Sequence, residues 1–100
     1  MMSNPTATIT SVTTGHSCWP STTICQGSET VIAEGLPVST LGHAAIPHQC
    51  IDVPFPVHGL SVAEGSETVI IEGLFAARIG DGMTCGDTIA AGVPSVITGD

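Results

Sequence analysis

Two segments of the chain are near copies of each other, and this repetition constrains the fold more than any other feature. Gly27 to His43 reads GSETVIAEGLPVSTLGH and Gly65 to Asp81 reads GSETVIIEGLFAARIGD, with ten of the 17 aligned positions identical. A shorter third copy from Gly92 to Asp100, GVPSVITGD, keeps the glycine and the Val-Ile pair. Internal repeats indicate equivalent units that pack on one another. We therefore expect one domain over residues 1–100, with repeats at about 27–43, 65–81 and 92–100.

Each of the two long repeats is predicted to be a β-hairpin. In the first, the β-branched run Thr30–Ile32 precedes Glu34-Gly35, and the chain returns over Leu36–Leu41. β-Branched side chains favour strands, and glycine accepts the positive φ that a tight hairpin turn requires. The second repeat follows the same plan around Glu72-Gly73. Because 12 glycines and seven prolines also oppose helices, the fold is predicted to be all-β.

Most of the histidines and cysteines lie in less regular stretches between the hairpins. These stretches are Thr13–Cys25, Ala44–Val57 and Met83–Thr88. The second of them contains three prolines, which are expected to limit regular strand pairing there.

The apolar core of this chain must be thin. Of its 100 residues only Trp19, Phe55 and Phe75 are aromatic, and a domain of this size buries a modest share of its surface. Small domains with such cores usually depend on a metal ion, disulfides or a partner.

The charge balance excludes several classes of partner. Nine acidic residues stand against a single base, Arg78, so the formal net charge is −8. Such a surface cannot neutralise nucleic-acid phosphates and is not attracted to anionic lipid. We expect Arg78 to pair with a nearby carboxylate or to anchor a partner surface. The recurring Glu29, Glu34, Glu67 and Glu72 are expected to be solvated and not catalytic.

No targeting segment is evident. Residues Met1–Thr14 lack a basic region followed by an apolar run, so no signal peptide is expected. No apolar stretch approaches the roughly 20 residues that a membrane helix needs.

Each repeat is preceded by a potential metal ligand. When the second and third repeats are aligned on Gly65 and Gly92, His58-Gly59 falls on Cys85-Gly86. The first repeat carries a few inserted residues, and its corresponding stretch is Gly15-His16-Ser17-Cys18. If three similar units converge at a point, these ligands meet there, and Pro47-His48-Gln49-Cys50 could supply a fourth.

Three neutral imidazoles and one thiolate make a closed tetrahedral zinc site. Such a site stabilises the fold and has no open position for chemistry, and its binding energy contributes to folding. The preferred ligands are His16, His48, His58 and Cys85. Cys18 and Cys50 are the first substitutes, because each lies two residues after a candidate histidine.

The remaining residues of these types have simpler interpretations. The four cysteines could instead form two disulfides in a secreted chain. Cys25 is expected to be a buried, inert thiol. His43 occupies the place that Asp81 takes in the second repeat, and is therefore expected to be a turn residue and not a ligand.

One stretch of the second repeat resembles a known motif. Residues Ala76-Ala77-Arg78-Ile79-Gly80-Asp81 closely resemble the Ala-Ala-Arg motif of the PAAR family, with Phe75 in place of the usual proline. The continuation over 83–89, the Gly-Ser-x-x-Val repeats and the His58-Gly59 pair are also similar. The resemblance extends from about Gly15 to Asp100. It is weakest in the first repeat, where Pro37-Val38-Ser39-Thr40 stands at the motif position.

This resemblance implies a specific architecture and role. Family members are small cones of short strands with pseudo-threefold repeats and a zinc ion near the apex, held by three histidines and one cysteine. One copy caps the blunt end of a trimeric β-helical spike and contacts the target cell membrane transiently. The Gly-His-x-Cys-Trp-Pro stretch is similar to versions found in tailed phages. A virion tail-baseplate tip is therefore expected first, and a type VI secretion tip or effector adaptor is the alternative.

An enzyme is not expected. Metal-dependent catalysis would need an open zinc position and a nearby base, and the sequence has no HExxH or nucleophile motif. We therefore expect no catalytic residues and no small-molecule substrate. The remote alternative is a disulfide-stapled secreted binding module.

Overall fold

The computed structural model describes residues 4–15, 19–48 and 58–99. Among these residues the chain forms short strands and no helix, which confirms the all-β prediction. No described segment could serve as a membrane-spanning helix. The strands pair antiparallel as β1–β8, β2–β3, β4–β5 and β6–β7. Their bounds are β1 Asn4–Thr6, β2 Ile32–Ala33, β3 Leu36–Pro37, β4 Ala44–His48, β5 His58–Ser61, β6 Ile70–Ile71, β7 Leu74–Phe75 and β8 Val93–Thr98.

The two long repeats form the expected hairpins. Ile32 pairs with Pro37 across β2–β3, and Ile70 pairs with Phe75 across β6–β7. The turn residues all have positive φ, which matches the primed turns favoured in two-residue hairpins. These angles are 50° and 82° in Glu34-Gly35, and 53° and 82° in Glu72-Gly73.

The third unit is completed by the other end of the chain. Strand β8 has no hairpin partner of its own and pairs instead with β1, where Ile97 faces Pro5. Pro5 thus takes the place of Pro37 and Phe75 in the other two units. The segment Pro5–Ile9 occupies the position of Phe75–Ile79, a correspondence that the sequence analysis missed.

Three chain segments meet in a closed ring at the centre of the molecule. The amide of Ser39 donates to Ala7, that of Ala77 to Ser39, and that of Ala7 to Ala77, each at 3.0 Å between nitrogen and oxygen. All three residues are fully buried. Isolated bridges repeat the same cycle, joining Thr8 to Val38, Thr40 to Ala76, and Thr6 to Arg78. The described chain therefore has an internal pseudo-threefold axis.

The turn after each ring segment has the same construction. In each turn, a residue with positive φ is followed by a residue whose side chain accepts a hydrogen bond. The donor is the backbone N–H of the residue three positions before the accepting one. His43 plays this part in the first repeat, with its Nδ1 2.9 Å from the amide nitrogen of Thr40, so the prediction that it is a turn residue is confirmed. The three accepting side chains are Ser11, His43 and Asp81.

The β4–β5 pair corrects one expectation. The prolines of the stretch 44–57 were expected to limit regular pairing, yet Ala44–His48 forms β4 and includes Pro47. The register shifts between Ala45 and His48. Such a bulge leaves a residue outside the hydrogen-bonded ladder and so accommodates a proline.

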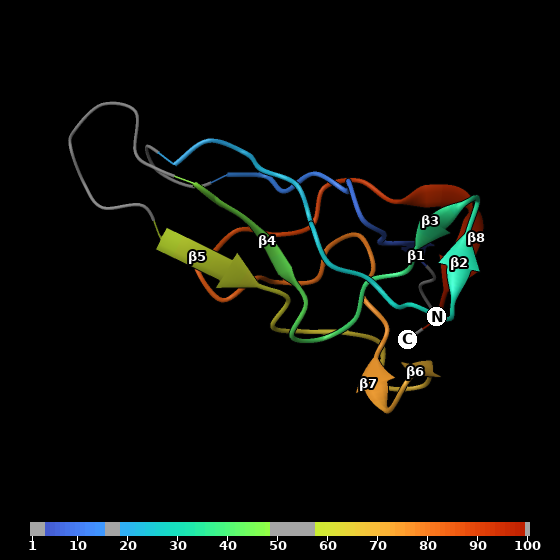
Figure 1. The fold of residues 1–100 in the computed structure, drawn as a ribbon. Coiled ribbons are helices and arrows are strands. Elements are labelled where there is room, and N and C mark those ends of the chain that lie inside the picture. Colours follow the sequence, from blue (N-terminus) through green and yellow to red (C-terminus); the bar gives the residue numbers. More distant parts are fainter. Residues whose placement is uncertain (1–3, 16–18, 49–57, 100) are drawn as a thin grey trace.

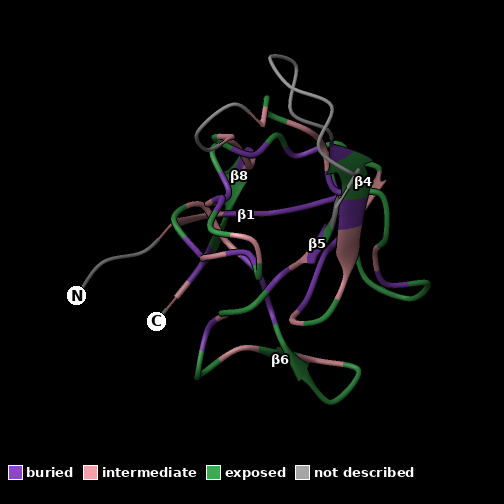
Figure 2. Cartoon of the chain, turned by 90° about the vertical axis from the view of Figure 1, so that its left-hand side faces the viewer, coloured by how far each residue is buried: buried purple, intermediate pink, exposed green. Residues whose placement is uncertain are grey.

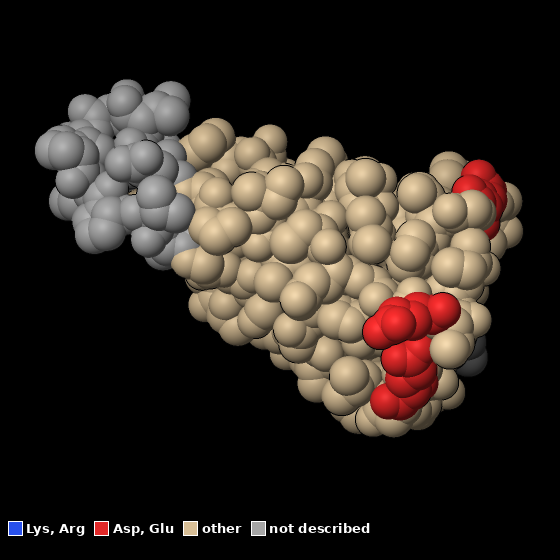
Figure 3. All heavy atoms as spheres, viewed as in Figure 1, with Lys and Arg blue, Asp and Glu red and all other residues tan. Residues whose placement is uncertain are grey.

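The described part of the chain narrows from one end toward the other (Figure 3). Strands β1, β2, β3 and β8 lie at one end with the two termini, near the β6–β7 hairpin, and β4–β5 extends away from them (Figure 1). The buried residues lie on the inner segments of the chain, whereas the β6–β7 hairpin is largely exposed (Figure 2). The main core cluster consists mostly of small and medium-sized side chains, as expected for a thin core. It contains Ala7, Ile24, Ala45, Leu60, Val62, Ala77, Met83 and Ile89.

The glycine that starts each unit is packed against the neighbouring strand. A Cβ at Gly65 would lie 2.8 Å from the Cβ of Phe75 and 2.9 Å from the carbonyl oxygen of Ala76. Because two backbones meet there, we expect Gly65→Ala to lower the free energy of unfolding by about 1–3 kcal/mol, measured by denaturant unfolding. Gly99→Ala is the control, since its Cβ would come no nearer than 3.8 Å to Thr68 Oγ1. Equal losses in the two variants would contradict this packing.

Candidate metal centre

One group of potential metal ligands forms among the described residues. His48, Cys85 and Asp87 each offer an atom, and these atoms all lie within 4.8 Å of one another. His48 ends β4, and the other two residues lie in the turn before β8. We refer to these three residues as the metal group.

His48 presents its Nε2 atom to this group. Its Nδ1 atom lies 2.8 Å from the carbonyl oxygen of Pro20. Because a carbonyl only accepts, Nδ1 carries the proton, and the lone pair of Nε2 can coordinate a metal. The Sγ atom of Cys85 lies 3.8 Å from Nε2. Two such ligands of one tetrahedral zinc lie about 3.6 Å apart, from bond lengths of about 2.3 and 2.05 Å, so the pair suits a shared metal.

Cys85 is held in a tight turn against the core. The amide of Met83 donates to the carbonyl oxygen of Asp87 at 2.8 Å, and Gly86 between them has a φ of 107°. Burial raises the pKa of the Cys85 thiol, a hydrogen bond from the Asp87 backbone lowers it, and the negative charge of Asp87 raises it again. Cys85 therefore stays protonated at neutral pH until a cation displaces the proton.

The structure brings together two of the residues proposed as ligands from the sequence. His48 and Cys85 face each other, although they are 37 positions apart. His58 begins β5 as the Cα partner of His48. The side chain of His58 lies outside the described part of the structure, as do the remaining candidates His16, Cys18 and Cys50. The complete four-ligand set therefore stays a prediction.

Asp87 is the member of the group that sequence reasoning missed. Its side chain is fully buried, and one carboxylate oxygen accepts the backbone N–H of Gly15 at 3.2 Å. The only sequence signal was its place two residues after Cys85, and that spacing does not reveal burial.

The prediction for Cys25 is wrong. Cys25 is exposed and carries a free thiol, 3.4 Å from the carbonyl oxygen of Ala44. It precedes the first hairpin at the place of Ala63 and Ala90, both also exposed. Neither of the two described cysteines, Cys25 and Cys85, is in a disulfide.

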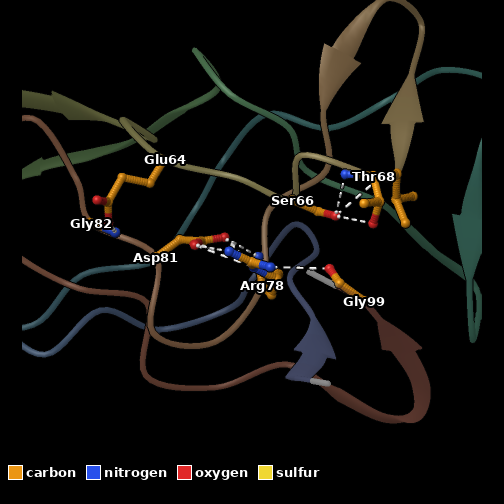
Figure 4. A network of polar contacts seen from close by, with 8 residues as sticks. Glu64, Ser66, Thr68, Arg78, Asp81, Gly82 and Gly99 are labelled. Atoms are coloured by element: carbon orange, nitrogen blue, oxygen red, sulfur yellow. Dashed lines mark hydrogen bonds and ion pairs between the residues drawn. The ribbon is translucent and has the colours of Figure 1, made fainter. Parts of the chain in front are cut away.

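Arg78 lies in a separate polar network that closes the ring of units. Its guanidinium donates to both carboxylate oxygens of Asp81, the Nη2–Oδ1 distance being 3.1 Å, and its Nη1 donates to the carbonyl oxygen of Gly99 at 3.0 Å (Figure 4). The predicted pairing with a carboxylate is confirmed. The same side chain ties the second repeat to the third repeat at Gly99.

The three strand pairs β1–β8, β2–β3 and β6–β7 form a broad face, which we call the base. Equivalent isoleucines project from it, with exposed fractions of 54% for Ile32, 51% for Ile70 and 51% for Ile97. A pocket of about 280 Å³ on the base is lined by residues of all three units. Three equivalent valines, Val31, Val69 and Val96, are among them. This apolar face is therefore centred on the pseudo-threefold axis.

Acidic side chains lie on the two hairpins of the base. Figure 3 shows them gathered at the wide end of the molecule, and Glu29, Glu34, Glu67 and Glu72 are all exposed as expected. Hydroxyl donors from Ser28 and Thr30 lower the pKa of the Glu72 carboxyl. This link between two hairpins is present at neutral pH and weakens as the pH falls through the lowered pKa.

The comparison with known proteins agrees with this geometry. A family model described as PAAR motif matches residues 14–91. No curated protein matches the chain. The matched span includes the metal group and both hairpins.

Proposed function

Because the chain belongs to the PAAR motif family, a structural family of spike tips in contractile injection or type VI secretion systems, we propose that it is the tip that caps and sharpens a trimeric β-helical spike. The observation that carries this proposal is the base, where equivalent apolar side chains surround a pocket on a pseudo-threefold axis. A single chain with three similar faces suits a partner with three identical ends.

The tapering shape and the metal group suit a part that is pushed through a membrane. A point under compressive load cannot contain a large apolar core, and the described core consists mostly of small and medium side chains. A metal ion crosslinks several loops in little volume. The role is structural, and no residue of the chain is assigned to catalysis.

We assign zinc as the metal. Neutral imidazole and thiolate ligands suit zinc, and His48 and Cys85 have a separation that fits a shared ion. His16 and His58 would complete the set, with Cys18 and Cys50 as substitutes. When bound, zinc in this closed site supplies folding energy.

The partner is a spike protein, and we propose one tip for each spike trimer. The base is open at the edges of its short strand pairs, so its backbone groups can continue the hydrogen bonding of a β-helix. Its apolar pocket would receive side chains that lie on the axis of the trimer. A homo-oligomer of this chain would leave the internal pseudo-symmetry without a purpose.

The expected stoichiometry with the cognate spike is 1:3. The chain is to be co-expressed with the spike encoded by a neighbouring gene, and the complex weighed by native mass spectrometry. Val31→Asp, Val69→Asp and Val96→Asp should each abolish the complex, because each places a charge in the same apolar pocket. The three losses should be equal, since the positions are related by the pseudo-symmetry.

Val12→Asp is the matched control. Val12 is 39% exposed, close to the 37% of Val31 and Val96, but it does not line the pocket. This variant should bind like the unmodified chain. A 3:3 complex, or no complex with any cognate spike, would contradict the proposed role of the base. Unequal effects at the three valines would show that the tip does not sit on the axis.

We propose a phage tail baseplate as the machine. The support is the Gly-His-x-Cys-Trp-Pro stretch at 15–20, which is similar to versions found in tailed phages. A type VI secretion tip or effector adaptor is the alternative. Baseplate and tail-tube genes beside this one would support the first assignment, and a cluster of type VI secretion genes would replace it with the second.

A further inference from the structure

Asp87 places a buried carboxylate at a position where the other two units have an uncharged residue. The backbone contacts of Ile24, Val62 and Ile89 are equivalent, since each donates its amide to the turn residue Ser11, His43 or Asp81, respectively. Two residues before them lie Thr22, Leu60 and Asp87. Leu60 belongs to the main core cluster, and Asp87 is fully buried. Burying a carboxylate at such a position is unfavourable unless hydrogen bonds or a cation compensate it.

The contacts of Asp87 are directed toward the metal group. One of its carboxylate oxygens accepts the amide of Gly15, and its backbone closes the turn that carries Cys85. Gly15 lies against the segment Trp19–Ser21, and Pro20 in that segment accepts the Nδ1 proton of His48. Asp87 therefore holds Gly15, and His48 holds the segment beside it.

The segment Trp19–Ser21 leaves Gly15 little room to shift. Its φ is 76°, and a Cβ there would lie 2.9 Å from both the amide nitrogen of Ser21 and the carbonyl oxygen of Trp19. Moving the Gly15 amide away from Asp87 would consequently disturb the segment that holds His48. This links two candidate ligands, His48 and Cys85, through one carboxylate.

We propose that Asp87 is a positioning residue for the metal site, which holds Gly15, and through it the segment Trp19–Ser21, against the Cys85 turn without itself ligating the metal. This inference rests on the proposed metal site. Its negative charge also lies near the cation, where it offsets part of the charge of a site with a single thiolate. Partners of metal ligands of this kind commonly change metal affinity by about 10- to 100-fold.

The test compares zinc binding by the full chain and its variants in competition with a chromophoric chelator. Asp87→Leu installs the residue of the second unit, and Asp87→Asn keeps the size and an oxygen acceptor. Both are expected to bind zinc about 10- to 100-fold more weakly, with the smaller loss for asparagine. Asp81→Asn is the control, because Asp81 is also buried and accepts a backbone N–H. It should lower the melting temperature but leave zinc affinity within about twofold of the unmodified chain.

A further measurement separates positioning from ligation. The absorption bands of the cobalt-substituted protein at saturation should be the same in the Asp87 variants and the unmodified chain. Altered bands would make Asp87 a ligand and overturn the proposal. Unchanged zinc affinity in both variants would also overturn it, whereas an unmodified chain that binds no zinc would refute the proposed metal site itself.

Discussion

Removing residues 1–11 is expected to abolish folding, although this segment lies outside both long repeats. The deletion removes β1, so β8 loses the only strand with which it pairs in the described structure. It also removes Ala7, which opens the central ring of backbone hydrogen bonds and leaves the Ala77 carbonyl and the Ser39 amide buried without partners. Each such buried group costs about 1–3 kcal/mol. Together with the lost packing, this exceeds what a small domain can tolerate. Circular dichroism should show no cooperative thermal transition, even with zinc added.

A circular permutant provides the control for this deletion. In the first hairpin, the paired residues Ala33 and Leu36 enclose a two-residue turn. Thr98 and Asn4 form the corresponding pair, and Gly99-Asp100 supplies two residues after Thr98. A chain that starts at Val12 and carries residues 4–11 directly after Asp100 should therefore fold and melt cooperatively. A folded deletion variant, or a permutant that does not fold, would contradict the assignment of the amino-terminal segment to the third unit.

Loss of the metal is expected to be nearly as damaging as loss of β1. Structural zinc in small domains contributes about 10–16 kcal/mol, whereas the net stability of a domain is about 5–15 kcal/mol. The unmodified chain should contain one equivalent of zinc by elemental analysis when purified without added metal. Chain unfolded with a chelator and then diluted should stay unfolded until zinc is restored. Zinc well below one equivalent, with iron also absent, would contradict the closed site.

Two cysteine variants make this prediction specific. Cys85→Ala removes a ligand and should abolish the chelator-sensitive part of the thermal stability. Cys25→Ala should change the free energy of unfolding by less than about 0.5 kcal/mol, as expected for an exposed side chain away from special features. His58→Ala is expected to behave like Cys85→Ala. Melting curves with and without chelator distinguish these outcomes, and equal losses at all three positions would mean that Cys85 is not the thiolate ligand.

The sequence was sufficient for features that depend on nearby residues. A glycine after a glutamate, between two β-branched or apolar runs, predicts a two-residue turn, because the turn needs positive φ and glycine accepts it cheaply. The hairpins around Glu34-Gly35 and Glu72-Gly73 were therefore predictable. The alignment of the repeats also placed Cys85 among the candidate ligands, since equivalent units bring equivalent positions to one place.

Other features are decided only by contacts between distant segments. The pairing of β1 with β8 joins residues as far apart as Asn4 and Thr98, and the segment 5–9 shares too few side chains with the other copies to be aligned by identity. Strand β4 accepts Pro47 because its register shifts against β5. The burial of Asp87 and the exposure of Cys25 likewise depend on which neighbours pack on each position. Local preferences determine turns and strands, whereas burial and closure of the ring depend on the whole chain being folded.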